Sequence, residues 1–303
     1  MRTAASHAAA LNNFYQNIKS GGGSASENAI LENAQRVSTP LATMMLSQMG
    51  LGNDTNVPFK LLENACGVGV VAPVLQRTIE PEVLKQSSIL CGDFSDQAID
   101  LVKKRITSEG WLNTEASRVD AQKTGLADGA FTHVATNIGF HVVPDSEAAL
   151  HEAIRVLQPG GVLGLTTWHK EPGWMVEVKK AFKSFPFEAP SEMPMQTTPW
   201  GDWSDVNWIR KTLVGKGLQD VKVDVFAYLT HVDSAEFFLV NFGAMIDVIM
   251  NGCWSEQLRK KHPRDEVHAM MRELLEKKYG GDGWDHSWIA IIASGKVPAD
   301  ARV

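Results

Sequence analysis

Cysteine is scarce in this chain, and the spacings that bind structural metals are missing. Its 303 residues include three cysteines, Cys66, Cys91 and Cys253, which form neither a C-x-x-C pair nor an even disulfide set. His262 and His268 stand six positions apart with a proline between them, a spacing that does not put both on one helical face. We predict free, mostly buried thiols, surface histidines, and neither a disulfide framework nor a metal site.

Positive charge and long apolar runs are also in short supply. Lysine and arginine number 29 against 35 acidic residues, and the formal net charge of −6 would repel the phosphates of nucleic acid. The most apolar stretch, 237–250, is interrupted by Asn241 and Asp247, and residues 1–7 hold too short an apolar run for a signal peptide. We expect a cytoplasmic protein with neither nucleic acid nor a membrane as a partner.

Hydrophobic residues make up 44% of the chain, enough for a large core. After a glycine- and serine-rich link at 20–26, helical spacing over 27–49 predicts a helical prelude with a break near Pro40. Strands are then expected at 59–63, 88–92, 116–119, 131–137 and 161–167, with helices at 70–76, 97–108 and 146–157. Such alternation predicts a parallel sheet with helices on both faces.

The alternation of predicted strands and helices ends after Trp168. The remaining predicted elements are a helix at 206–215, a strand at 221–229, helices at 234–250 and 263–279, and a strand at 287–293. If the two strands pair antiparallel at the sheet edge, the segment between them forms a lid. We therefore predict an N-terminal helical cap (1–58), a core (59–170), and lid helices with two strands that complete the core sheet (171–303).

The most informative segment is residues 61–69, where an apolar strand ends at Glu63 and runs into a turn with Gly67 and Gly69. Glycines let the backbone approach a ligand, and the N–H groups that open the following helix attract negative charge. The spacing fits a dinucleotide fingerprint, yet Glu63 would repel a pyrophosphate. The same carboxylate suits a nucleoside with a cationic end, directly or through water. A plain structural turn is the alternative.

Acidic residues close the next two predicted strands. Asp93, at the end of the second strand, is placed to accept hydrogen bonds from two ribose hydroxyls. Its alternative role is to cap the following helix, for which Ser95 competes. Asp120 can accept from an adenine amino group while Ala121 offers its backbone N–H, although an aspartate there also suits a surface turn.

Two further motifs complete a specific order. Segment 137–139 (Asn-Ile-Gly) follows the fourth strand, and segment 159–161 (Pro-Gly-Gly) precedes the fifth. Together with the glycine turn and the strand-end acids, this order resembles the class I S-adenosylmethionine-dependent methyltransferases over residues 60–170. The similarity is to the ubiquinone-biosynthesis-like small-molecule type, and to its fungal secondary-metabolite branch, which includes the thiomethyltransferase that acts on gliotoxin.

The chain departs from the family pattern at two positions. Ala65 stands where these enzymes usually have glycine, and Glu63 where aspartate is commoner. An alanine fits the loop if its φ angle is negative.

The resemblance implies an α/β fold: a Rossmann-like, doubly wound, seven-stranded and mostly parallel sheet with an antiparallel edge strand, a helical N-terminal prelude and a helical lid. It also implies S-adenosylmethionine as cofactor and S-adenosylhomocysteine as product. The residues that it assigns to the cofactor are Tyr15 (carboxylate), Glu63, Ala65, Cys66, Gly67 and Gly69 (methionyl part), Asp93, Phe94 and Ser95 (ribose and adenine), Asp120 and Ala121 (adenine), and Asn137 and Ile138 (near the sulfonium).

The activity that the resemblance implies is transfer of a methyl group to an O, N or S nucleophile of a small, largely apolar metabolite. The protein's main task is then to hold the nucleophile about 3 Å from the methyl carbon and exclude water, so a general base is optional. His141, just after the fourth strand, is our candidate base, and His169 is the second choice. The alternative for His141 is a hydrogen bond to a loop carbonyl.

Apolar and aromatic side chains supply candidates for the acceptor pocket. We expect His141, Trp168, Phe242 and Met245 to line it. Several tryptophans fall in or beside the presumed lid and would either wall a planar acceptor or pack among themselves: Trp168, Trp174, Trp200, Trp203 and Trp208.

Other functions fit parts of the pattern. One alternative is a methyltransferase-like regulator or protein methyltransferase, and another is an enzyme of this fold that catalyses a non-methyl reaction such as a pericyclic rearrangement. An NAD dehydrogenase is the outside choice. A monomer or a homodimer is expected.

Overall fold

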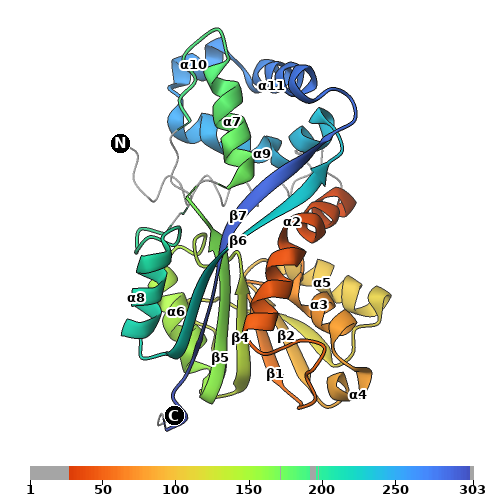
Figure 1. The fold of residues 1–303 in the computed structure, drawn as a ribbon, viewed down its shortest axis with the longest axis vertical. Helices are drawn as coiled ribbons and strands as arrows, with labels where there is room; N and C mark the ends of the chain where they lie inside the picture. Colours follow the sequence, from red (N-terminus) through yellow and green to blue (C-terminus); the bar gives the residue numbers. More distant parts are fainter. Residues whose placement is uncertain (1–26, 171, 192–195, 197, 301–303) are drawn as a thin grey trace. The chain divides into compact units, whose positions relative to one another are not determined.

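The computed structural model describes residues 27–170, 172–191, 196 and 198–300 (Figure 1). The predicted glycine link and Tyr15 lie outside the described residues.

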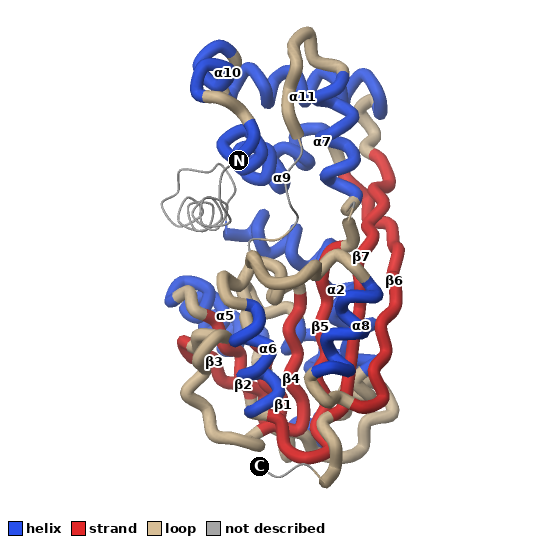
Figure 2. The backbone as a smooth tube through the Cα atoms, turned by 90° about the vertical axis from the view of Figure 1, so that its left-hand side faces the viewer, coloured by secondary structure: helices blue, strands red, loops and turns tan. Residues whose placement is uncertain are grey.

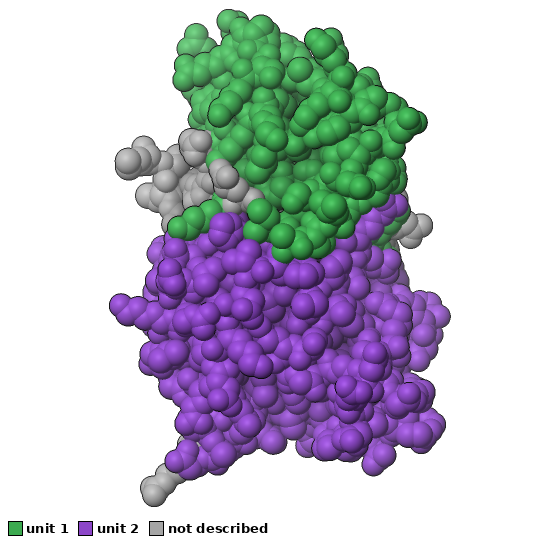
Figure 3. Space-filling view, in the orientation of Figure 1, with its two compact units in different colours: residues 1–33, 170–197, 227–289 green, residues 34–169, 198–226, 290–303 purple. Residues whose placement is uncertain are grey.

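The chain divides into two compact units, coloured in Figure 3. Unit 1 comprises the described parts of 1–33, 170–197 and 227–289, and unit 2 those of 34–169, 198–226 and 290–303. Both units are therefore made of segments that are distant in the sequence.

A seven-stranded sheet has the order β3-β2-β1-β4-β5-β7-β6. The pairs formed by β1, β2, β3, β4 and β5 are parallel, whereas β7 runs antiparallel to β5. The mostly parallel sheet with an antiparallel strand near its edge is thereby confirmed. The strand bounds are β1 (Lys60–Asn64), β2 (Ser88–Asp93), β3 (Thr114–Arg118), β4 (Phe131–Asn137), β5 (Leu157–Trp168), β6 (Gln219–Val232) and β7 (Trp284–Lys296).

Helices cover both faces of the sheet in unit 2, with α6 and α8 on one side and α2, α3 and α5 on the other (Figure 1). Successive side chains of a strand point to opposite faces, so Leu61 packs with the α2, α3 and α5 side and Leu62 with the α6 and α8 side. The helix bounds are α2 (Glu27–Gln48), α3 (Val71–Thr78), α4 (Pro81–Leu84), α5 (Asp96–Glu109), α6 (Ser146–Arg155) and α8 (Val206–Gly215).

Four helices of the described residues lie wholly within unit 1: α7 (Gly173–Lys183), α9 (Ala235–Cys253), α10 (Glu256–Lys261) and α11 (Arg264–Tyr279). The apolar helix α9 is buried as its composition predicts, with Phe238 beside Trp284 and Phe242 beside Trp288 at ring-centroid distances of 5.9 and 5.4 Å. Strands β6 and β7 lie side by side (Figure 2), and each has residues in both units.

No single helix of the described chain is long and apolar enough to cross a membrane, and α9 meets that test only as two segments, Ala235–Gly243 and Met245–Cys253, bent by 57°.

The predicted break near Pro40 and the predicted place of the Pro-Gly-Gly segment before the fifth strand are both wrong. Helix α2 continues through Pro40, because Val37 and Leu41 on either side are buried and their packing offsets the missing N–H. The Pro-Gly-Gly segment 159–161 lies inside β5, where the register with β4 shifts, so it forms an irregular stretch of strand instead of a preceding turn. The short helices α4, α7 and α10 were not predicted.

Tryptophans within α8 and just before it form a packed cluster in unit 2. The Trp203 ring stacks on Phe140 at 4.8 Å between centroids, and its Nε1 donates to the hydroxyl of Ser146 at 2.9 Å. Trp200 and Trp208 pack against Trp203 at 6.0 and 5.2 Å. Since Trp203 is only 1% exposed, its packing role is favoured over a wall for an acceptor.

A substitution at Gly173 tests how closely the start of α7 packs on β7. A Cβ added at Gly173 would lie 1.6 Å from the backbone oxygen of Ser287. We expect Gly173→Ala to lower the free energy of unfolding by about 1–3 kcal/mol, measured by urea denaturation. The matched control is Gly215→Ala in α8, where no atom lies within 4 Å, and a comparable loss there would contradict the prediction.

Candidate functional site

The strand ends that carry the predicted site meet at one edge of the sheet. Strand β1 lies between β2 and β4 and runs parallel to both. Parallel strands have their carboxyl ends at the same edge, where ligands bind in open α/β sheets. The glycine turn, Asp93 and Asn137 are thereby brought to neighbouring positions.

Glu63 joins the end of β1 to the start of α3. Its Oε1 accepts from the N–H groups of Val70 and Val71 at 2.9 Å, and its Oε2 accepts from Ala72 at 3.0 Å. Burial raises the pKa of this carboxyl in spite of the backbone donors, and the side chain is 1% exposed. The negative charge that the helix N-terminus attracts is therefore Glu63 itself, and these three N–H groups are not free to bind a pyrophosphate.

The turn itself is left-handed at three positions. Ala65, Gly67 and Gly69 have φ angles of 54°, 54° and 74°. The condition of a negative φ at Ala65 is therefore not met, and alanine occupies a conformation that favours glycine. A Cβ added at Gly67 would meet no atom within 4 Å, so this part of the turn is open.

Asp93 ties the turn to the helix that follows β2. Its Oδ2 accepts from the N–H of Gly67 at 2.8 Å and its Oδ1 from the N–H of Ser95 at 2.9 Å. Burial raises the pKa of Asp93, and each carboxylate oxygen has a second lone pair for a ligand hydroxyl. Ser95 caps α5 by accepting from the N–H of Ala98, so the alternative role of Asp93 as the cap is wrong and Asp93 stays available to a ligand.

Phe94 presents an aromatic ring beside that carboxylate. It is 63% exposed, unusual for a phenylalanine, and the guanidinium carbon of Arg118 lies 4.9 Å from its ring centroid. An exposed ring at this edge offers a stacking surface for a base.

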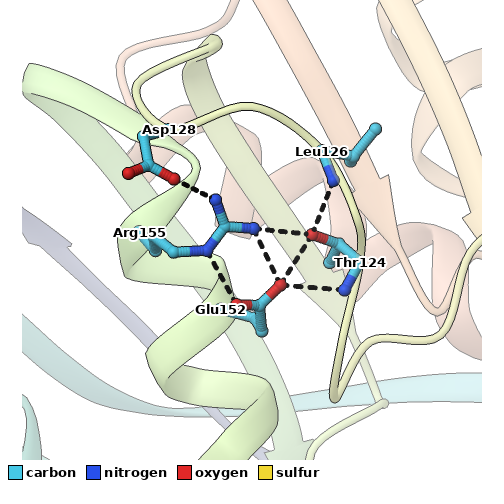
Figure 4. A network of polar contacts seen from close by, with 5 residues as sticks. All are labelled: Thr124, Leu126, Asp128, Glu152 and Arg155. Carbon is cyan, nitrogen blue, oxygen red and sulfur yellow. Dashed lines mark hydrogen bonds and ion pairs between the residues drawn. The ribbon is translucent and has the colours of Figure 1, made fainter.

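The loop after β3 carries Asp120 and the buried Ala121. Oδ1 of Asp120 accepts from the N–H and the side-chain amide of Gln122 at 2.9 and 3.0 Å. This part of the chain is braced by the polar network of Figure 4, in which Arg155 pairs with Glu152 at 2.7 Å and with Asp128, and Glu152 accepts from the hydroxyl of Thr124 at 2.7 Å. The hydrogen bond from Arg155 lowers the pKa of Glu152 to about 2, so the brace stays charged.

Asn137 and Ile138 are held by a threonine that the motifs do not include. The hydroxyl of Thr166 donates to Oδ1 of Asn137 at 2.5 Å and accepts from the N–H of Ile138 at 2.9 Å. Ile138 has a φ of 56°, an outlier for a β-branched residue. Strain of this kind collects at functional sites, where neighbouring contacts hold it in place.

Unpaired polar atoms lie beneath this edge. Both side-chain atoms of Asn64 and the hydroxyl of Thr136 are buried without a partner among the described residues. The register of β1 and β4 pairs Glu63 with Ala135. Asn64 and Thr136, the next residue on each strand, therefore lie at adjacent positions. Buried polar groups without partners cost free energy, which identifies the spot as one for an ordered water or ligand atom.

Two thiols lie behind the glycine turn. Cys66 and Cys91 are both free and buried, and Cys91 donates to Oε2 of Glu63 at 3.5 Å. Interaction with Cys91 and burial raise the pKa of the Cys66 thiol well above its ordinary value. The pKa of Cys91 is also raised, so both thiols are protonated at neutral pH, and their burial agrees with the predicted free, buried thiols.

The candidate base His141 is buried in the loop after β4. It is 5% exposed, and its Nδ1 lies 3.4 Å from the hydroxyl of Thr167. Burial lowers its pKa from the ordinary 6.5 to about 4, so the ring is neutral at physiological pH. Trp168 ends β5 in the same unit, and His169 follows it.

Phe242 and Met245 belong to unit 1, so their predicted place in an acceptor pocket stays a prediction. The two histidines predicted to lie on the surface are instead largely covered, each side chain being 12% exposed, since His262 stacks on Phe187 and His268 pairs with Asp247. In the described ranges no three His, Cys, Asp or Glu side chains are grouped to hold a metal ion.

The sequence reading missed Thr166 and Asn64 because a single threonine or asparagine at a strand end has no distinctive spacing. It also missed Arg105, which follows Lys103 and Lys104 in the sequence. A signal was present, since position 105 follows Ile99 and Val102 at intervals of three along the apolar face of α5.

The residues at this edge fit S-adenosylmethionine. The open face at Gly67, the carboxylate of Asp93 and the exposed ring of Phe94 suit an adenosyl group. The helix N–H groups already taken by Glu63 disfavour a dinucleotide and leave negative charge behind the turn, which suits a cationic ligand.

Replacing the strained alanine provides a test of the turn's conformation. Ala65→Gly should raise the free energy of unfolding by about 1 kcal/mol, because the strain relieved exceeds the added entropy of the unfolded chain. Ala269→Gly, at an exposed position of α11, should instead lower it by about 1 kcal/mol. Equal losses in the two variants would contradict the left-handed conformation of Ala65.

Because His141 is neutral in the folded protein, we expect the fold to lose stability in acid. The pKa of His141 is lower in the folded protein than in the unfolded chain. Its contribution to the free energy of unfolding is therefore complete above pH 6.5 and is lost as the pH falls toward 4. In this window each such histidine adds up to ~1.4 kcal/mol per pH unit to the slope of the unfolding free energy. Urea denaturation of His141→Asn at several pH values should give a slope smaller by this amount, and identical slopes would refute it.

Comparison with known proteins agrees with the geometry. Residues 62–165 match the methyltransferase domain family. The chain is 32% identical over 266 residues to methyltransferase tpcH of Aspergillus fumigatus, covering 87% of this chain and 93% of that protein. It is 29% identical over 273 residues to the acetylaranotin bis-thiomethyltransferase of Aspergillus terreus, covering 89% of each.

Solved structures show the same fold. The YcgJ protein of Bacillus subtilis matches with a TM-score of 0.52 at 12% identity, covering 86% of this chain and 98% of that chain. A putative methyltransferase of Bacillus halodurans matches with a TM-score of 0.51 at 16% identity, covering 84% and 98%.

Sequence similarity over nearly the whole length of methyltransferase tpcH thus coincides with a strand order and a strand-end site of the expected kind. The chain belongs to the class I S-adenosylmethionine-dependent methyltransferases, in their fungal secondary-metabolite branch, and is an enzyme that methylates a small metabolite.

Proposed function

We propose that the acceptor atom is the sulfur of a thiol on a small, largely apolar metabolite. The sequence left O, N and S open, and the observation that favours sulfur is the burial of His141, whose pKa of about 4 makes it a weak base. A relative of similar length is named as a bis-thiomethyltransferase, which supports the same choice.

The cofactor-facing roles in this proposal belong to the strand-end residues. When bound, S-adenosylmethionine supplies a methyl group on a positively charged sulfonium, already a good leaving group. Asp93 accepts from ribose hydroxyls, Phe94 and Ala121 contact the base, and Asp120 accepts from its amino group. Glu63 keeps a negative charge behind the turn formed by Ala65, Cys66, Gly67 and Gly69, and Asn137 and Ile138 border the sulfonium side. Tyr15 keeps its proposed contact with the cofactor carboxylate.

His141 then acts on the acceptor's proton only weakly. A thiol with a pKa near 8.5 is partly ionised at neutral pH, whereas a phenol near 10 depends on a stronger base. A neutral imidazole next to Thr167 can accept a hydrogen bond and orient such a nucleophile without carrying its proton for long. His141 and Trp168 line the acceptor pocket in this proposal, while the roles of Phe242, Met245 and the lid helices stay predictions.

The cellular setting is also proposed. Free cysteines, two of them buried, suit a reducing compartment, which supports a cytoplasmic enzyme. The net charge of −6 disfavours nucleic acid as a partner. We infer a monomer or homodimer that is not bound to a membrane.

A matched acceptor series tests the proposal. Purified enzyme with S-adenosylmethionine is given benzenethiol, phenol or aniline, and products are identified by mass spectrometry. We expect methylation of benzenethiol at least about tenfold faster than of phenol after subtraction of the uncatalysed rate, because the thiol is far more ionised. His141→Asn should slow the thiol reaction by less than about tenfold.

Preference for phenol or aniline would overturn the thiol proposal. Cofactor binding without turnover of any of the three acceptors would favour the regulator or protein methyltransferase. Isomerised product of unchanged mass with a polyene substrate would favour the non-methyl alternative.

A further inference from the structure

The glycine turn is held from behind by a buried arginine. Arg105 of α5 is 4% exposed, and its Nη1 donates to the carbonyl oxygens of Val68 at 2.6 Å and Gly69 at 2.5 Å. One guanidinium thus fixes two successive peptide groups of the turn. A charged donor makes stronger hydrogen bonds than a neutral one, and here both acceptors lie away from bulk water.

The guanidinium is itself held in place by two residues. Its Nε donates to Glu109 at 2.7 Å, and Glu109 also accepts from the indole Nε1 of Trp111 at 3.0 Å. The ring of Trp111 lies 4.8 Å from the Arg105 guanidinium carbon. The planar fork is therefore oriented before any ligand arrives.

The turn is held both by the end of β2, just before α5, and by α5 itself. At the start of the helix, Asp93 accepts from Gly67 and from Ser95, the residue that caps α5. Toward its C-terminus, Arg105 holds the next two carbonyls of the turn. Three consecutive residues of the turn are thus anchored, Gly67 to the end of β2 and Val68 and Gly69 to α5.

We infer that Arg105 is a positioning residue for S-adenosylmethionine, which it serves by holding the turn in the conformation that accepts the cofactor. Without the guanidinium, the carbonyls of Val68 and Gly69 lose a buried donor and turn toward other partners. Gly67 and Gly69 leave their left-handed conformations at little cost, so the turn then spreads over several conformations. Affinity falls in proportion to the fraction of molecules that keep the competent one.

Calorimetric titration of the full chain with S-adenosylhomocysteine tests this role. Arg105→Met should weaken binding about tenfold or more, because the competent turn is no longer the main population. Arg105→Lys keeps the charge but not the two-pronged geometry, and its affinity should lie between those of wild type and Arg105→Met.

The matched control is Arg210→Met. Arg210 of α8 also donates to two carbonyls, those of Val221 and Val223 on the outermost strand β6, at 3.4 and 2.8 Å. Its loss should change the affinity by less than about twofold, whatever it does to stability.

Hydrogen exchange of the ligand-free protein separates positioning from a general loss of stability. In Arg105→Met we expect faster exchange in peptides covering 63–76 and unchanged exchange in β4 and β5. Unchanged affinity in Arg105→Met, or an equal loss in Arg210→Met, would overturn the inference. If Arg105→Met does not fold, the variants Arg105→Lys and Glu109→Gln must bind S-adenosylhomocysteine more weakly than the wild type. Wild-type affinity in both of them would also overturn the inference. The result does not depend on which acceptor the enzyme uses.

Discussion

The carboxylate of Glu63 is the interaction on which the site depends. It leaves the end of β1 and closes the N-terminus of α3, a helix with no side-chain cap of its own, so strand, turn and helix share one buried charge. That arrangement fixes where the turn can run and removes the helix N–H groups from ligand binding. Asp93 and Arg105 bind the backbone of the same turn. The preference for a cationic cofactor follows from the negative charge of Glu63 behind it.

Much of the fold could be predicted because the sheet follows from local pattern. Strand β4 and helix α8 have the predicted bounds, since an apolar run and a capped amphipathic segment define them without help from distant residues. The break at Pro40 was wrong because tertiary packing outweighs a local cost. Helix α7 was missed although Trp174, Val178 and Ala181 recur at helical spacing, because Pro172 and Gly173 at its start favour a loop.

The candidate site could also be predicted only in part. The order of Glu63, Asp93, Asp120 and Asn137 could be seen in the sequence, because strand-end positions in a parallel sheet meet at one edge. The left-handed conformations of Ala65 and Ile138 could not, since they depend on partners far along the chain, such as Thr166 for Ile138. The neutrality of His141 likewise comes from burial by elements distant in sequence.

The interleaving of the two units has a consequence for how the gene can be divided. Unit 1 is interrupted by unit 2, and β6 and β7 each cross from one to the other. No single cut in the coding sequence releases either unit as a continuous polypeptide, so a minimal cofactor-binding fragment would have to be spliced from three stretches. The order β1 to β5 is nevertheless complete before residue 170. Exchange of the later segments between related genes therefore leaves the cofactor edge of the sheet uninterrupted.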